Sequence, residues 1–184
     1  IFANQCFNKG NTKITLGTGA SILTNIGQSF EYNNNIITTL SYVYKNKPSY
    51  SYECLINYAG ATISWLKNNL KIISSEKQIN KIFTNTKNTE GVVFVPAFVG
   101  LSSPYWKPNS KALIHGLTPS INKNQIIRAA LESIAFQIKD YLDDLEMRNK
   151  IKYNDIYIDG GIVSNGSFMQ FLTNTLNKKI YVTN

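Results

Sequence analysis

Residues 12–24 read TKITLGTGASILT, and this stretch decides the fold class. Ile14 and Leu16 alternate with polar residues, the glycine turn 17–19 follows, and a second apolar run begins after Ser21. Alternation with a period of two on both sides of a short glycine turn predicts a pair of strands. This stretch therefore predicts that a sheet forms early in the chain.

The turn Gly17-Thr18-Gly19 is the first candidate for chemistry. Glycine lets a backbone turn tightly and approach a bound group closely. The exposed amides and the Thr18 hydroxyl could hold phosphate oxygens in an anion nest. On local grounds an ordinary hairpin turn explains the same residues, so both interpretations stay open.

A second glycine turn, Asp159-Gly160-Gly161, follows a predicted strand over residues 151–158 and precedes a predicted helix over 167–176. The carboxyl end of a strand beside a helix N-terminus is where α/β sheets place nucleotides. The glycine spacing matches neither a Rossmann fingerprint nor a Walker A loop. A nucleotide turn and a structural turn therefore explain it equally well.

The remaining pattern alternates between strand and helix signals. In the first half we expect a β-meander, with further strands over 36–40 and 50–52 around a turn at 45–48. The later elements that we expect are a helix over 55–70, a helix over 76–83 capped by Ser74-Ser75, a buried central strand over 92–95, a helix from a capping box at Asn122 and Gln125 to Leu145, and a strand that starts at Ile180.

Composition excludes several classes of function. The net charge is +8, yet charged residues make up only 16% of the chain, and Arg128 and Arg148 are the only arginines. Dispersed lysines are typical of a solvated surface and not of a nucleic-acid interface, which favours arginine. No apolar run is long enough for a membrane span, and the first twenty residues lack the apolar core of a signal peptide. The two cysteines fit a reducing compartment, so we expect a cytoplasmic protein.

His115 is the only histidine, and it lies in a predicted strand over residues 112–117. A packed or surface role explains a single histidine better than catalysis does. A histidine-based metal site is excluded, and a Ser-His-Asp triad would have to use His115 alone.

Taken together and in order, several stretches resemble the C-terminal domain of the FGGY carbohydrate kinases, and within them the subgroup that acts on glycerol. The matching stretches are residues 15–19 (TLGTG), 59–66 (AGATISWL), 95–101 (VPAFVGL), 104–106 (PYW), 116–118 (GLT), 127–135 (IRAALESIA), and 159–161 (DGG) through Asn165 to 169–170 (MQ).

The resemblance implies an α/β fold of the actin-like, ribonuclease-H-like ATPase type, with a mixed sheet flanked by helices. Residues 1–184 would form the second ATPase domain, incomplete at both ends. The implied reaction transfers the γ-phosphoryl group of ATP to a terminal hydroxyl of glycerol, giving glycerol 3-phosphate. The implied cofactors are ATP and Mg²⁺, the implied substrate is glycerol or a related polyol, and the family leaves room for a homo-oligomer.

The resemblance also carries nucleotide-binding roles onto named residues. Thr18 would contact the ATP phosphates, and Ser64 stands where the family usually has glutamine. The full set implied for the nucleotide is Gly17, Thr18, Gly19, Gly60, Ser64, Gly161 and Asn165.

Ser21 is one of several departures from the family pattern, and it keeps alternatives open. Ser21 stands where the family has an aromatic residue against the glycerol carbons, a loss of roughly 1 kcal/mol of apolar contact. A pentulose or gluconate kinase, or a catalytically degenerate nucleotide-binding relative, therefore remains an alternative. The family's catalytic Asp falls upstream of Ile1, so we expect neither a catalytic residue nor a metal ligand here, only part of an ATP site.

Overall fold

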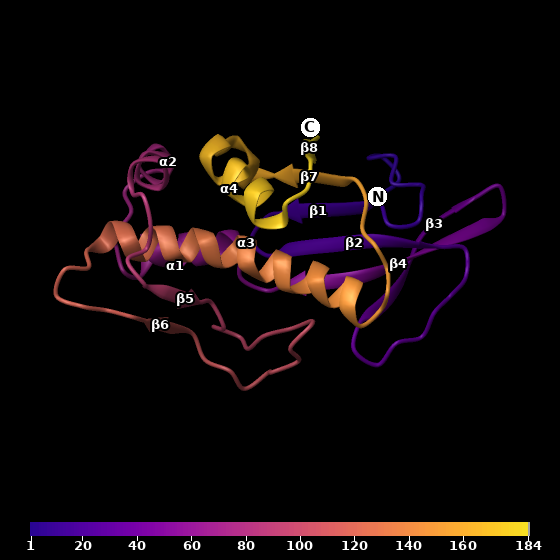
Figure 1. Ribbon diagram of the computed structural model, residues 1–184, viewed down its shortest axis with the longest axis horizontal. Coiled ribbons are helices and arrows are strands. Elements are labelled where there is room, and N and C mark those ends of the chain that lie inside the picture. The colour runs from indigo at the N-terminus through magenta and orange to yellow at the C-terminus, as the bar shows by residue number, and fades with distance from the viewer. Residues whose placement is uncertain (184) are drawn as a thin grey trace.

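Six strands form one mixed sheet, and the computed structural model describes it within residues 1–183 (Figure 1). The domain predicted for residues 1–184 ends at Asn184, which lies outside the described residues. In chain order the elements are β1 (Thr12–Leu16), β2 (Ala20–Gly27), β3 (Ile37–Tyr44), β4 (Lys47–Ile56), α1 (Gly60–Asn68), α2 (Glu76–Asn85), β5 (Val93–Val95), β6 (Leu113–His115), α3 (Lys123–Met147), β7 (Ile156–Gly160), the 3-10 helix η1 (Gly161–Ser164), α4 (Gly166–Leu176) and β8 (Ile180–Val182).

The strand order is β3-β4-β2-β1-β7-β8, with antiparallel pairs on one side of β1 and parallel pairs on the other. β1 thus has β2 as one neighbour and β7 as the other. Its last residue, Leu16, is opposite Ala20 on β2 and opposite Gly160 on β7. This register brings both glycine turns to one end of the sheet, and it confirms the predicted mixed sheet.

The predicted β-meander is wrong in its order. β4 lies between β2 and β3, so the second strand of the β3–β4 hairpin is the inner one. Burial gives the reason: β4 buries Tyr52, Cys54 and Ile56, whereas β3 exposes Leu40 and Val43. The strand with more side chains for the core takes the inner position.

Two other predicted elements have different bounds or surroundings. The helix expected over 55–70 begins only at Gly60, because Leu55 and Ile56 pair with β2 as the end of β4. The segment expected as a buried central strand is β5, which pairs only with β6 in a separate two-stranded sheet. Phe94 is buried while Val93 is 53% exposed, so this strand is covered on one face only.

Helix α3 is the longest helix, and it runs along the sheet (Figure 1). Asn122 and Gln125 form the predicted capping box, and Ile127, Ile134 and Tyr141 are completely buried. The predicted helices at 76–83 and 167–176 are confirmed as α2 and α4. The strand expected from residue 151 begins at Ile156.

One arginine ties α2 to the helices beside it. Arg128 on α3 donates from Nη1 to the carbonyl oxygens of Phe83, at 2.9 Å, and Thr86. Its guanidinium carbon lies 4.6 Å from the centroid of the Phe83 ring, and its Nε is 2.6 Å from Glu132 Oε1. These contacts satisfy carbonyls at the end of α2 and hold that helix against α3.

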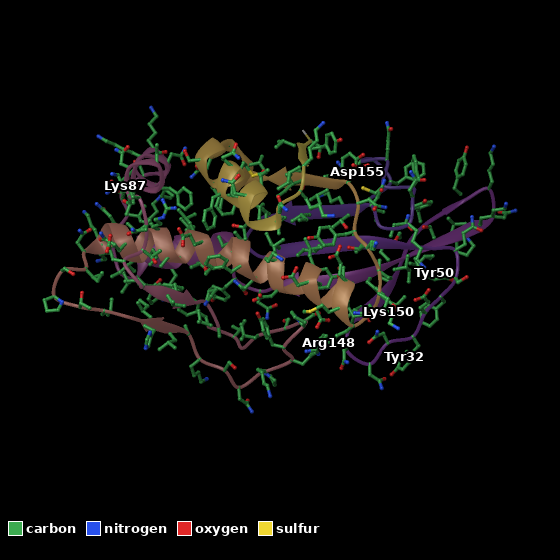
Figure 2. The ribbon with its side chains drawn as sticks, in the orientation of Figure 1. Tyr32, Tyr50, Lys87, Arg148, Lys150 and Asp155 are labelled. Carbon is green, nitrogen blue, oxygen red and sulfur yellow. The ribbon has the colours of Figure 1, made fainter. Side chains whose placement is uncertain are left out.

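The surface charge is scattered, as the sequence predicts. In Figure 2, Lys87 lies near α2 at one end of the molecule, and Arg148 and Lys150 lie together near the far end of α3. Within residues 1–183, no helix has both the length and the apolar character that crossing a bilayer requires.

Candidate functional site

The first glycine turn is held by helix α1. The amide of Gly60 donates to the Gly17 carbonyl at 3.0 Å, and the amide of Ala61 donates to the Thr18 carbonyl at 2.8 Å. Helix α1 has no side-chain cap, so these carbonyls take the place of one. The turn and the start of α1 are therefore one structural unit.

Glycine is needed in this unit for close approach and not for an unusual backbone angle. A Cβ on Gly60 would lie 2.6 Å from the Gly17 carbonyl oxygen, and a Cβ on Gly19 would lie 2.6 Å from the Ile56 carbonyl oxygen. Neither Gly17 nor Gly19 is among the residues with positive φ. Close packing is thus the reason for glycine at positions 19 and 60, whereas a Cβ on Gly17 would meet only the Gly19 carbonyl oxygen at 3.8 Å.

The second glycine turn combines one strained residue and one open residue. Gly160 has φ +110°, and a Cβ there would lie 2.1 Å from the Leu16 carbonyl oxygen. Around Gly161, no protein atom comes within 4 Å of the position of a Cβ. The first glycine is needed for the fold, and the second leaves open space.

Asn165 lies at the end of this turn and caps α4. Its Oδ1 accepts a hydrogen bond from the Phe168 amide at 3.0 Å, while the residue is only 4% exposed. Its Nδ2 is buried and has no hydrogen-bond partner in the protein. A buried donor without a partner is costly, and Asn165 is also one of the residues that line a cavity.

The two turns meet at one cavity of about 280 Å³, which we call the turn cavity. Its walls come from β1, α1, α2, α3 and the segment after β7. The lining residues are Leu16, Gly17, Thr18, Gly60, Ile63, Ser64, Ile79, Asn80, Leu131, Gly161, Ile162, Ser164 and Asn165.

Six of the seven residues predicted for the nucleotide line this cavity, and Gly19 is the exception. Residues to which the sequence assigned no nucleotide role form the apolar wall of Ile63, Ile79, Leu131 and Ile162, together with Asn80. Ile79 and Asn80 belong to α2, which carries no motif. Only the packing of α2 against α3 brings them to the site.

Ser21 lies elsewhere. It borders a second, more open cavity of about 380 Å³, which Thr15, Leu55 and Asn57 also line. Its Oγ donates to Glu53 Oε1 at 3.5 Å. Gly17 and Gly19 border this space as well, so the first glycine turn separates the two cavities.

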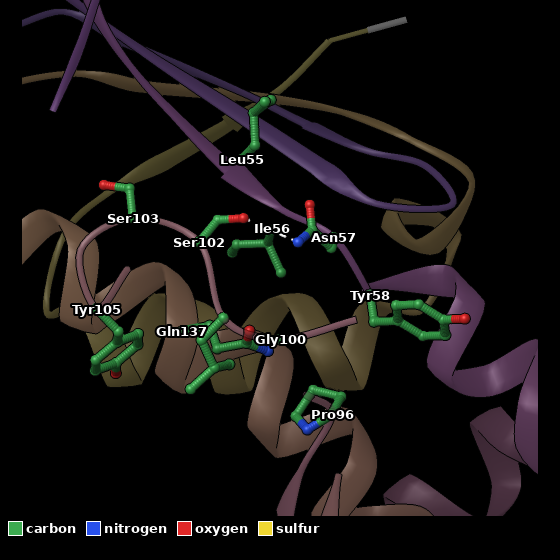
Figure 3. Close-up of a pocket in the computed structure, with 11 residues that line it drawn as sticks. Leu55, Ile56, Asn57, Tyr58, Pro96, Gly100, Ser102, Ser103, Tyr105 and Gln137 are labelled. Carbon is green, nitrogen blue, oxygen red and sulfur yellow. Dashed lines mark hydrogen bonds between the residues drawn. The ribbon is translucent and has the colours of Figure 1, made fainter. Parts of the chain in front are cut away.

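A third space, shown in Figure 3, is too small for a substrate. It lies between Ile56, Pro96 and Gln137 and measures about 10 Å³. Asn57 Nδ2 donates to Ser102 Oγ across one side of it at 2.9 Å. Room of this size accepts about one water molecule.

Asp159, beside the second turn, is already paired. Lys13 Nζ donates to its Oδ1 at 2.6 Å and also contacts Thr15 Oγ1, and the Lys13 side chain is only 9% exposed. Among residues 1–183, no cluster of three or more His, Cys, Asp or Glu could hold a metal ion. His115 is exposed on β6. These residues therefore provide no ligand cage for Mg²⁺.

The chain is similar to known proteins over almost its whole length. Residues 12–184 match the model of the FGGY family of carbohydrate kinases, C-terminal domain. The chain is 41% identical over 181 residues to the glycerol kinase of Fusobacterium nucleatum, covering 98% of this chain and 36% of that protein. The chain thus spans about a third of the length of its curated relatives.

Solved structures agree with this similarity. The crystal structure of Plasmodium falciparum glycerol kinase with ADP aligns with a TM-score of 0.89 and 38% identity, covering 97% of this chain and 36% of that chain. A gluconate kinase from Lactobacillus acidophilus aligns with a TM-score of 0.80 at 20% identity, covering 97% of this chain and 36% of that chain, a likeness of fold alone.

Proposed function

The chain belongs to the FGGY family of carbohydrate kinases, with the actin-like ATPase fold of those enzymes, and from that premise we propose that it serves the ATP-dependent phosphorylation of glycerol to glycerol 3-phosphate. In this proposal residues 1–183 supply part of the ATP site. The two relatives named above with 38% identity or more are glycerol kinases, and one of them has a solved structure with ADP.

One observation carries the proposal: two glycine turns far apart in the sequence meet at a cavity that is lined by an unpartnered buried donor. Asn165 Nδ2 has no partner in the protein, and Gly161 leaves open space at the same wall. A bound nucleotide would fill this volume. The walls of the cavity are apolar beside the polar turn, as expected of a site for a base next to phosphates.

The residues have distinct roles in this proposal. Thr18, with the amides of its turn, contacts the phosphates. Gly60 and Ser64 line the nucleoside from α1, and Gly161 and Asn165 line it from the segment after β7. Phosphoryl transfer depends mainly on positioning and on charge stabilisation. These residues therefore bind and orient the nucleotide, and we propose that the general base comes from another part of the enzyme.

Mg²⁺ is part of the proposal only through the class of reaction. Magnesium at kinase sites is held largely by substrate phosphates and water, with one or two carboxylates from the protein. Asp159, the carboxylate beside the turn, is engaged by Lys13. We therefore assign no Mg²⁺ ligand to this chain.

The identity of the phosphorylated substrate has a second candidate. Ser21 borders the open cavity across the first turn from the nucleotide, where a small hydroxyl leaves room for a larger substrate. This observation favours a pentulose or gluconate as the second candidate. A catalytically degenerate relative that only binds nucleotide is the third.

We also propose a cytoplasmic location, and a homo-oligomer is compatible with the proposal. Cys6 and Cys54 are free and buried, and burial raises the pKa of the Cys6 thiol to about 11 and that of Cys54 to about 12. Both thiols are thus protonated at neutral pH, and free cysteines without a disulfide suit a reducing compartment.

The test is an ADP titration of the chain by calorimetry, with Thr18→Ala as the variant and the exposed Asn68→Ala as the control. We expect binding that Thr18→Ala weakens and Asn68→Ala does not change. Failure of ADP to bind at millimolar concentration would overturn the proposal. Glycerol 3-phosphate production by the 184 residues alone would overturn the assignment of the general base to another part of the enzyme.

A further inference from the structure

We infer that a groove at the tip of the β3–β4 hairpin docks an extended acidic segment of a partner protein, with one apolar side chain of that segment as the anchor. The groove, which we call the hairpin groove, measures about 390 Å³. It shares no lining residue with the turn cavity or with the cavity beside Ser21, so the inference does not rest on the proposed function. Figure 1 shows the hairpin at the end of the molecule far from α1 and α2.

The walls of the hairpin groove are aromatic and partly exposed. Phe7 and Tyr44 line it and are 48% and 55% exposed, and Tyr42 lines it between them. Phe2 lies beside these rings, with its ring centroid 5.4 Å from that of Tyr42, and Phe7 is 5.9 Å from Tyr42. Both contacts are edge to face, which holds the rings in place. Exposed aromatic rings gathered around a hollow are typical of a surface that receives an apolar anchor.

The rim of the groove is positively charged. Lys45 and Lys47 line it and are exposed, and no acidic residue lines it. Among residues 1–183, no salt bridge involves either lysine. Lys45 and Asn46 form the turn between β3 and β4 with positive φ angles of 48° and 59°, and Lys45 Nζ lies 5.4 Å from the centroid of the Tyr44 ring. The groove therefore complements carboxylates that flank an apolar side chain.

The strand that forms one wall also has a free edge. β3 is the outermost strand of the sheet, and no charged residue or proline occurs between Ile37 and Tyr44. Leu40 and Val43 on this strand are more than half exposed. An edge strand presents unpaired backbone groups, along which an extended peptide can pair. This free edge favours a peptide segment over a small anionic molecule.

The charges and the ring geometry argue against two other occupants. If two copies met groove against groove, Lys45 and Lys47 would approach the same lysines of the second copy, and like charges repel. Single-stranded nucleic acid stacks its bases on open aromatic faces along a basic track. Here Phe2, Phe7 and Tyr42 meet edge to face and leave no row of parallel open faces. An acidic peptide fits the groove better than either.

The first experiment measures binding of a fluorescein-labelled peptide, EDEWEDE, to the chain by anisotropy. We expect a dissociation constant below about 1 mM, at least about tenfold weaker binding of EDEAEDE, and no binding of KKKWKKK. Excess ADP is expected not to displace the peptide. Equal binding of EDEAEDE, displacement by ADP, or no binding of EDEWEDE at millimolar concentration would overturn the inference, and none of these results would alter the proposed nucleotide site.

The second experiment locates the peptide with two double variants of equal charge change. Lys45→Glu with Lys47→Glu is expected to weaken EDEWEDE at least about tenfold, whereas the exposed control pair Lys87→Glu with Lys111→Glu changes it by at most about twofold. Tyr44→Ala is expected to weaken it about fivefold. Equal losses in both double variants would show attraction by net charge alone and would overturn the inference. It would also be overturned by tighter binding of a ten-residue oligothymidylate, or by a dimer in sedimentation that only the first double variant abolishes.

Discussion

Gly160 and Gly161 are neighbours after the same strand, yet their surroundings differ completely. A Cβ on Gly160 would meet the Leu16 carbonyl at 2.1 Å, while a Cβ on Gly161 would meet nothing within 4 Å. The first turn has a similar division: a Cβ on Gly19 would lie 2.6 Å from the Ile56 carbonyl oxygen, whereas a Cβ on Gly17 would meet only the Gly19 carbonyl oxygen at 3.8 Å, an ordinary contact distance. The comparison teaches that each turn has one glycine that packing requires, Gly19 or Gly160, and one with space beside it that lines the turn cavity, Gly17 or Gly161.

Gly160→Ala is expected to have the largest effect. Gly160 has φ +110° and ψ 174°, a region that is essentially restricted to glycine, and the added Cβ collides with β1. We expect a loss of about 3 kcal/mol in the free energy of unfolding. Equilibrium unfolding in urea measures this free energy. A stability equal to that of the parent would show that β1 and β7 are not in the register described.

Gly60→Ala tests the packed first turn and is expected to have the next largest effect. The added Cβ meets the Gly17 carbonyl at 2.6 Å, so the turn and α1 must separate. We expect the free energy of unfolding to fall by about 2 kcal/mol, because the overpacking outweighs the better helix propensity of alanine. We also expect ADP to bind more weakly. Unchanged stability with unchanged ADP affinity would contradict the idea of one structural unit.

Asn165→Ser and Asn165→Ala separate the cap from the donor in the second turn. Serine retains an N-cap oxygen but lacks the amide donor, so we expect stability within about 0.5 kcal/mol of the parent and ADP binding about tenfold weaker. Alanine removes both, at a further cost of about 1 kcal/mol in stability. The role of Nδ2 is wrong if serine and asparagine bind ADP equally well.

Gly161→Ala is expected to have the smallest effect on the fold. The Cβ enters open space, so we expect a change of at most about 0.5 kcal/mol in stability and a loss of about tenfold in ADP affinity. Thermal unfolding and calorimetry on one preparation give both values. A stability loss as large as that of Gly160→Ala would remove the contrast between the two glycines.

The periodic elements and the two turns could be predicted from the sequence because their signals are local. The capping box of Asn122 and Gln125 predicts the start of α3, and the alternation around Gly17 predicts β1 and β2. The place of β4 between β2 and β3 depends on which strand buries more apolar side chains, and no local pattern carries that information. Leu55 and Ile56 match a helical period and a strand equally well, and pairing with β2 decides for the strand.

The residues of the candidate site also fall into two groups, those with a local sequence signal and those that only tertiary packing brings to the site. Thr18, Gly161 and Asn165 could be indicated from motifs, which a resemblance then linked into one site. Asn80 and Ile79 could not, because their position depends on how Arg128 holds α2 against α3. Nor does the sequence tell that Gly160 and Gly161 have opposite surroundings, since that difference comes from the carbonyl of a distant strand.

The pairing of β1 with β7 also determines when the site can form. Lys13 and Asp159, which join these strands, are 146 positions apart in the chain. Contacts over such distances form slowly, and during synthesis the later strand emerges after the earlier elements. The first turn and α1 can associate early, but the cavity wall of Gly161 and Asn165 arrives only after β7. Nucleotide binding would then report that β7 has paired with β1, and a nucleotide would stabilise the paired form selectively over partly folded forms.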